Sequence, residues 1–262
     1  MVIKGLDALL RLLLKSESIV TEIIYETKGR AREYCELSAN LYRGCDHGCT
    51  YCYAPLATRR NRDDFIHPTI RKDALSKLKN DAKKLANKGE TRPILLSFTT
   101  DPYQHYDEIH QITRMAIEIL HENNLKITLL TKGGRRSERD FDLLSLHPDL
   151  SEYGTTLVFT DERLREQIEP YAAPTNERIK SLKKAHKLGI FTFVSLEPVW
   201  SPQQSLDLIK KTHKFVDFYK VGKLNYNPQQ SVIDWKLFRE DVVAMLSELG
   251  KDYYIKKDLQ KY

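Results

Sequence analysis

Cysteine, long apolar runs and an excess of one charge are all scarce in this sequence. Four cysteines in 262 residues exclude a small secreted scaffold held together by disulfides. No run reaches the roughly 18 to 20 apolar residues that span a bilayer. The formal net charge is only +6, from 42 basic and 36 acidic residues, which permits an anionic partner without requiring one. A chain of this length can bury a core without disulfides or a structural metal.

The N-terminal residues give no sign of export. Residues 5–15 are leucine-rich but contain Asp7 and Arg11, and no small-residue cleavage site follows them. They predict an amphipathic helix rather than a signal peptide. We therefore expect a cytoplasmic protein with no membrane segment. We expect one domain over residues 31–262, preceded by a short N-terminal segment at 1–30.

From about residue 68 the sequence alternates between helical periodicity and short apolar runs. The expected helices are at 69–87, 110–123, 137–146, 176–188, 203–213 and 232–249. The expected strands are at 36–41, 94–99, 126–131, 155–160, 190–196 and 215–221. Six β-then-α units predict an α/β fold with a parallel sheet, as an open doubly wound sheet or as a partial barrel. Neither glycine-rich phosphate-binding motif is present, which argues against a dinucleotide-binding or P-loop fold.

Three of the four cysteines, Cys45, Cys49 and Cys52, fall within eight residues in the string NLYRGCDHGCTYCYAP. Three thiolates on one loop can bind three irons of a [4Fe–4S] cluster and leave the fourth iron open, which is typical of a reactive metal centre. The alternative is a structural zinc site with Cys35 or His47 as the fourth ligand. Zinc sites usually show a second ligand pair, and none follows here.

The spacing C-x3-C-x2-C, with an aromatic residue before the last cysteine, resembles the signature of radical S-adenosylmethionine (SAM) enzymes. The longer string N-x-Y-R-G-C-x-H-G-C-x-Y-C-Y-A is similar to the spore photoproduct lyase branch, as are TTDPYQ, LLTKGG, IEPYAAPTNERI and KVGKLNY. The resemblance covers about residues 35–226. It implies a partial (β/α)6 barrel, a [4Fe–4S] cluster and SAM. It also implies an electron donor such as flavodoxin or ferredoxin, and cleavage of SAM to a 5′-deoxyadenosyl radical that abstracts hydrogen from a substrate.

The ends of the predicted strands supply candidate SAM contacts, because function in barrels lies where strands end. Thr100 and Asp101 follow the second strand and offer a hydroxyl and an acid to a ligand ammonium or ribose. Glu197 ends the fifth strand and could reach the ribose hydroxyls. The resemblance adds three residues with implied roles: Lys132 and Thr156 would bind the SAM carboxylate, and the backbone of Tyr51 would contact the adenine.

Basic residues follow the cysteines and the third strand, with tyrosines among them. They suit a phosphate-bearing substrate, which makes a nucleic-acid base or nucleotide the leading hypothesis. The enzymatic alternative is a peptide or a small metabolite, and the non-enzymatic one is a structural or electron-transfer iron–sulfur protein. Spore photoproduct lyases quench the product radical with a cysteine beyond the cluster, but no cysteine follows Cys52 here. Either a tyrosine such as Tyr103 replaces it or the reaction differs. The candidate substrate residues are Arg59, Arg60, Arg62, Arg135 and Arg136.

Overall fold

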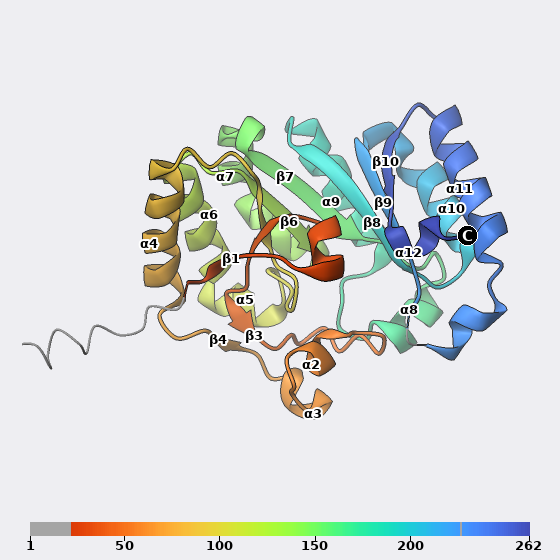
Figure 1. Cartoon of the computed structure of the whole chain (residues 1–262), viewed down its shortest axis with the longest axis horizontal. Coiled ribbons are helices and arrows are strands. Elements are labelled where there is room, and N and C mark those ends of the chain that lie inside the picture. Colours follow the sequence, from red (N-terminus) through yellow and green to blue (C-terminus); the bar gives the residue numbers. More distant parts are fainter. Residues whose placement is uncertain (1–21, 226) are drawn as a thin grey trace, which may run out of the picture.

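The computed structural model describes residues 22–225 and 227–262 (Figure 1). Within these residues, eight strands form one sheet in the order β1–β2–β5–β6–β7–β8–β9–β10. Strand β1 pairs antiparallel with β2, and every other pair in this sheet is parallel. The strands are β1 (Ile24–Glu26), β2 (Leu37–Ala39), β5 (Ile94–Leu96), β6 (Ile127–Thr131), β7 (Ser151–Thr156), β8 (Phe191–Val199), β9 (Phe218–Lys223) and β10 (Asp252–Ile255). The expected helix at 5–15 lies outside the described residues.

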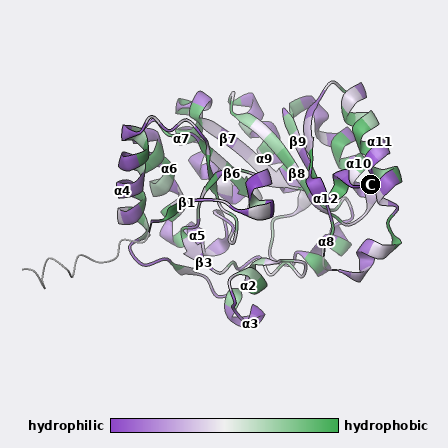
Figure 2. Cartoon of the chain, in the orientation of Figure 1, coloured by the Kyte–Doolittle hydropathy of each residue, from purple (hydrophilic) through white to green (hydrophobic). Residues whose placement is uncertain are grey.

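Helices connect the parallel strands, and most lie close to their predicted positions. The helix expected at 69–87 starts later, at Ala74, because Thr69–Ile70 form β4. The long ones are α4 (Ala74–Asn87), α6 (Ile112–Glu122), α9 (Thr175–Lys187), α10 (Pro202–Thr212) and α11 (Trp235–Glu248). The 3-10 helix η2 (Gly134–Asp140) and helix α7 (Phe141–Leu146) occupy the predicted helix at 137–146. In Figure 2, α4 and α11 carry hydrophilic and hydrophobic stripes, as expected of helices that cover a buried sheet. The mostly parallel sheet with its helices confirms the predicted α/β class.

One predicted strand is displaced along the chain. Apolar content places it at 155–160, whereas β7 runs from Ser151 to Thr156. Leu157 and Phe159 are fully buried although they lie beyond the last residue of the strand. The strand instead includes Gly154, where a Cβ atom would lie 2.3 Å from the Phe193 ring. That glycine leaves room for a phenylalanine from the neighbouring strand.

The segment between β1 and β2 contacts β10 and α12, at the other edge of the sheet. It contains the 3-10 helix η1 (Gly29–Glu33). The Glu33 carboxylate accepts hydrogen bonds from the Tyr254 hydroxyl (3.1 Å) and the Lys257 N–H (2.8 Å). Because β2 and β10 lie far apart in strand order, these contacts require the sheet to curve around an interior. Residues 29–33 therefore close the gap between the two ends of the curved sheet.

A second, two-stranded sheet holds the cysteine loop. Strand β3 (Tyr42–Arg43) pairs with β4 (Thr69–Ile70), and the short helices α2 (Ala54–Ala57) and α3 (Arg62–Phe65) lie between them. This excursion projects from one side of the fold, as Figure 1 shows. The remaining short α-helices among the described residues are α5 (His105–His110), α8 (Glu162–Ile168) and α12 (Lys257–Gln260). Among the described residues, no helix is long and apolar enough to cross a membrane.

Candidate active site

The three clustered cysteines lie on one tight loop between β3 and α2, and all three are free thiols. The Cys45 N–H donates to the Phe65 carbonyl (2.9 Å), and the Cys52 N–H donates to the Cys49 carbonyl (3.1 Å). Gly44 precedes the loop with φ of +88°, and a Cβ atom there would lie 2.5 Å from the Phe65 carbonyl oxygen. Only glycine meets both the positive φ and the close approach.

The electrostatics of the loop fit a metal cluster. Burial raises the pKa of the Cys49 thiol to about 12. Burial, the Asp101 carboxylate and the two other cysteines raise the pKa of Cys45 well above its ordinary value. The thiols of Cys45 and Cys49 therefore resist ionisation unless a cation is near. A bound metal centre supplies that positive charge, as it does for coordinating thiols in general.

Residues that follow β5 form hydrogen bonds to the cysteine loop. The Thr100 hydroxyl donates to the Gly44 carbonyl (2.7 Å), and the Gln104 side-chain oxygen accepts from the Asp46 N–H (3.1 Å). The Asp101 carboxylate accepts from the Lys132 N–H (2.7 Å), and it also bonds the Thr131 hydroxyl and the Tyr103 N–H. The side chains of Thr100 and Asp101, both predicted SAM contacts, are thus used in contacts that hold the cysteine loop: Thr100 with Gly44, and Asp101 with His47.

A buried histidine connects Asp101 to an arginine. His47 is 2% exposed, its Nδ1 lies 3.4 Å from the Asp101 carboxylate, and its Nε2 lies 2.9 Å from Arg136 Nη2. Since a guanidinium only donates, His47 Nε2 is the acceptor and the Nδ1 proton faces Asp101. Burial opposes ionisation of Asp101, but His47 and the hydrogen bonds hold the pKa of Asp101 well below its usual range. Arg136 also donates to the Tyr103 carbonyl (2.8 Å).

Lys132 lies beside the cysteine loop, within a group of charged residues. Its Nζ is 5.6 Å from the centre of the Tyr51 ring, and the Tyr51 hydroxyl donates to Glu169. Glu169 forms a fully buried ion pair with Arg178 (2.6 Å). Burial disfavours the charge on Lys132, but the neighbouring Cys49 and Glu169 outweigh burial and raise the pKa of Lys132. Lys132 is therefore a cation at neutral pH, as a carboxylate ligand would require.

Thr156 ends β7, whereas Glu197 lies inside β8, which continues to Val199 and so does not end at Glu197 as the sequence predicted. Thr156 lies opposite Ser195 in the register of β7 and β8, two residues before Glu197. The Tyr34 hydroxyl bonds both Ser195 Oγ and the Glu197 carboxylate, each at 2.6 Å. Lys256 Nζ lies 2.8 and 2.9 Å from the two Glu197 oxygens. The structure thus joins Glu197, a predicted SAM contact, to two partners from distant parts of the chain.

The candidate substrate arginines differ in their surroundings. Arg62 donates to the carbonyls of the cysteine loop, and Arg60 donates to the Asp64 carbonyl (2.7 Å). Arg136 bonds His47, as described above. The exposed side chains of Arg59 and Arg135 form no hydrogen bond or ion pair within the described part of the chain.

Tyr103, the candidate for quenching the product radical, is buried in the core. It is 1% exposed, and its ring lies 5.6 Å from the Arg139 guanidinium. A role in radical chemistry would therefore require transfer through the protein rather than contact with the substrate.

The two candidate fourth ligands for zinc, Cys35 and His47, are both engaged with other groups. Cys35 lies before β2, and its thiol donates to the carbonyl of Pro93 (2.8 Å), which precedes β5. Cys35 is thus near the amino ends of the strands, whereas the cysteine loop lies beyond their carboxyl ends. Both ring nitrogens of His47 are already bonded. Within the described residues, no three His, Cys, Asp or Glu side chains converge on one metal position, and this holds for the three clustered cysteines as well. The choice of an iron–sulfur cluster over zinc therefore rests on the cysteine spacing and on the family, not on converging side chains.

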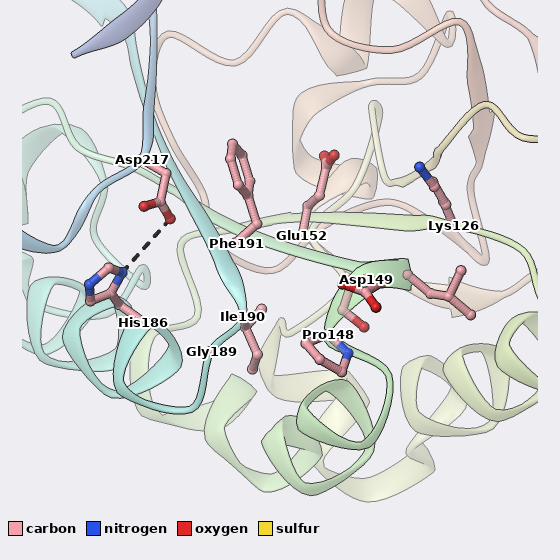
Figure 3. A pocket seen from close by; sticks show the side chains of 11 residues that line it. Lys126, Pro148, Asp149, Glu152, His186, Gly189, Ile190, Phe191 and Asp217 are labelled. Atoms are coloured by element: carbon pink, nitrogen blue, oxygen red, sulfur yellow. Dashed lines mark ion pairs between the residues drawn. The ribbon is translucent and has the colours of Figure 1, made fainter. Parts of the chain in front are cut away.

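A separate hollow of about 460 Å³ lies at the amino ends of β7 and β8 (Figure 3). Two of its carboxylates are engaged: Asp217 pairs with His186 (3.8 Å), and Glu152 accepts from the Thr128 hydroxyl (2.6 Å). Active sites in barrels lie at the carboxyl ends of the strands. The hollow is therefore distinct from the site at the cysteine loop.

Comparison with known proteins identifies the family to which the chain belongs. The family model described as the radical SAM superfamily matches residues 39–216. The chain belongs to the radical SAM superfamily. Among curated relatives, an uncharacterized protein of Methanocaldococcus jannaschii is 26% identical over 188 residues, which cover 71% of this chain and 69% of that protein. An uncharacterized protein of Mycobacterium tuberculosis is 23% identical over 169 residues, which cover 62% of this chain and 49% of the relative.

Solved radical SAM structures share the fold. A spore photoproduct lyase mutant with bound AdoMet and dinucleoside spore photoproduct has a TM-score of 0.71 at 12% identity, over 92% of this chain and 80% of the other. SuiB of Streptococcus suis, bound to S-adenosylmethionine, has a TM-score of 0.62 at 15% identity. The match covers 83% of this chain and 49% of SuiB. The chain thus spans about half the length of SuiB and of the mycobacterial relative.

These comparisons confirm the predicted family, the α/β partial-barrel fold of radical SAM proteins and the assignment as an enzyme. The superfamily implies SAM and a [4Fe–4S] cluster, which the cysteine loop fits. Sequence reasoning missed Glu169 and Arg178, although both fall in the quoted string IEPYAAPTNERI, where an acid and a base flank a turn. It also missed Tyr34 and Lys256, which are separated by more than 200 residues and give no local signal.

Proposed function

We propose that this radical SAM enzyme abstracts hydrogen from a nucleic-acid base or a nucleotide. The observation that carries the proposal is a pair of exposed tyrosines at the cysteine loop. Tyr53 follows Cys52 and is 51% exposed. Tyr171 is 58% exposed, and its N–H donates to the His47 carbonyl (3.2 Å). Exposed aromatic rings beside a reactive centre suit the stacking of unpaired bases, which contributes about 1–3 kcal/mol per base.

Arg59 and Arg135 supply the charge for a phosphate in this proposal, because both are exposed and have no side-chain partner among the described residues. Arg60, Arg62 and Arg136 would contribute mainly by supporting the loop. Two phosphate contacts predict a modest salt dependence, with a slope of log affinity against log salt of about −1.4 for single strands.

The chain's own residues would bind and orient the cofactor. When bound, the cluster and SAM together supply a 5′-deoxyadenosyl radical. The Lys132 ammonium and the Thr156 hydroxyl would hold the SAM carboxylate, and the Tyr51 backbone would contact the adenine. Glu197 would accept from the ribose hydroxyls, with Lys256 and Tyr34 fixing its orientation. We further propose flavodoxin or ferredoxin as the electron donor and the cytoplasm as the location.

The test is anaerobic reconstitution with iron and sulfide, followed by SAM, dithionite and single-stranded DNA or RNA. We expect 5′-deoxyadenosine and a nucleoside of altered mass after nuclease digestion. Binding to single strands should weaken with salt, and Arg59→Ala with Arg135→Ala should flatten that slope by about one unit or more. An absence of salt-dependent binding to any nucleic acid would exclude this substrate class.

A peptide substrate is the second candidate. A structure of SuiB bound to its precursor peptide SuiA has a TM-score of 0.58 over 86% of this chain, at 15% identity. Leu56 on α2 is 84% exposed close to Tyr53, which suits an apolar side chain better than a phosphate. Mass spectrometry of peptide fractions from the same reaction separates the two candidates.

A further inference from the structure

Arg62 contacts the cysteine loop in a way that no neighbouring arginine does. It is the first residue of α3, and both ends of its guanidinium point to the main chain of the loop. Nη1 lies 3.0 Å from the Cys49 carbonyl oxygen, and Nη2 lies 3.0 Å from the Cys52 carbonyl oxygen. One planar side chain thus connects two of the three cluster cysteines.

Helix α3 is itself firmly held, so it can act as a support. The Asn61 side chain caps it by accepting from the Asp63 N–H (3.1 Å). Phe65 is 3% exposed, and the Arg60 guanidinium stacks on its ring at 5.7 Å. The Phe65 carbonyl accepts from the Cys45 N–H (2.9 Å). All three cluster cysteines are therefore bonded to α3, one through Phe65 and two through Arg62.

The charge of Arg62 matters as much as its geometry. A guanidinium stays protonated at every physiological pH, and its donors are fixed in one plane. The potential of an iron–sulfur cluster depends on nearby charge, hydrogen bonding and exposure to solvent. A permanent positive charge bonded to two of the cysteines favours the state that holds one more electron.

We propose that Arg62 is a positioning residue for the cluster, which fixes the Cys49–Cys52 turn and raises the reduction potential of the centre. The proposal rests on the cluster that the superfamily implies, but not on the identity of the substrate. The two hydrogen bonds from the Arg62 guanidinium hold the ligand loop in place, so they also slow the loss of iron. The two effects can be measured separately. The positive charge of Arg62 acts on the reduction potential, and its paired hydrogen bonds act on the retention of iron.

The experiment compares Arg62→Ala and Arg62→Lys with the control Arg43→Ala. Arg43 is an exposed arginine in β3, two residues before Cys45, and its side chain forms no hydrogen bond or ion pair among the described residues. Its removal therefore takes the same charge from the same region without touching a cysteine carbonyl. The measurements are the midpoint potential by EPR-monitored titration and the rate of iron transfer to a chelator.

We expect Arg62→Ala to have a more negative midpoint and to lose iron several-fold faster than the wild type. Arg62→Lys should keep a midpoint close to the wild-type value but lose iron quickly, and Arg43→Ala should match the wild type in both. Wild-type values for Arg62→Ala would overturn the proposal. An equal shift in Arg43→Ala would also overturn it, because the effect would then be one of general charge.

A second readout needs no cluster. In the cluster-free protein, hydrogen exchange at the amides of residues 45–53 should be several-fold faster in Arg62→Ala than in Arg43→Ala. Equal exchange would refute the positioning role even if Arg62→Ala fails to assemble a cluster. Neither readout measures chemistry on the substrate. A failure of the proposed nucleic-acid activity would therefore leave these differences in place, and the two failures are distinguishable.

Discussion

Replacing Arg178 with methionine should destabilise the protein by about 3–5 kcal/mol, the usual cost of removing one partner of a buried ion pair. Arg178 has no exposed surface and bonds three groups: the Glu169 carboxylate (2.6 Å), the Ala173 carbonyl (2.7 Å) and the Thr156 carbonyl (3.0 Å). Methionine leaves a buried carboxylate and two buried carbonyls without these donors. For a chain of 262 residues, this corresponds to a fall in Tm of about 5–10 °C.

The size of the loss should depend on pH. Burial alone would favour protonated Glu169, but Arg178 and Lys132 reverse this and lower the pKa of Glu169. A lowered pKa gives stability that is present above the ordinary glutamate pKa and is lost as the pH falls through the folded-state value. Without Arg178, the pKa of Glu169 should rise, so protonation relieves the unpaired charge. The deficit of Arg178→Met should therefore shrink between pH 7 and pH 5.

The assay is urea unfolding of the cluster-free protein, followed by circular dichroism at both pH values. Arg163→Met is the matched control, since Arg163 is exposed on α8 and its side chain has no partner among the described residues. The control should stay within about 0.5 kcal/mol of the wild type. If Arg178→Met unfolds with the control, or if its deficit is the same at both pH values, the reasoning about the buried pair is wrong.

Two further predictions concern the cofactors. Replacing any of the three clustered cysteines with alanine, Cys45→Ala for example, should abolish binding of about four irons per chain. Cys35→Ala should retain them, because Cys35 bonds Pro93 at the other end of the strands; stoichiometric zinc without an iron chromophore would contradict the cluster assignment. Lys132→Ala should weaken SAM binding by about 1.5–3 kcal/mol, the range for a hydrogen bond to a charged group, with iron content unchanged. Undiminished SAM cleavage at low SAM concentration would show that Lys132 has another role.

The sequence alone predicted the features that depend on neighbouring residues. Helices α6, α9, α10 and α11 begin and end within three residues of the positions that periodicity predicts. The cysteine loop was evident because its three thiols lie within eight residues. The displaced strand β7 shows where this reasoning fails, since apolar content marked residues that are buried beyond the strand end.

The tertiary structure decided which charged groups meet. The sequence does not distinguish the arginines that follow the cysteines from one another, nor Arg135 from Arg136. The fold does: Arg62 and Arg136 bond residues of the cysteine loop. Arg59 and Arg135 stay exposed. Likewise, Glu197 acquires Lys256 and Tyr34 only because the curved sheet brings its two ends together. A side chain's periodicity is set by the few residues around it, whereas the partner of a buried charge is set by contacts across the whole chain.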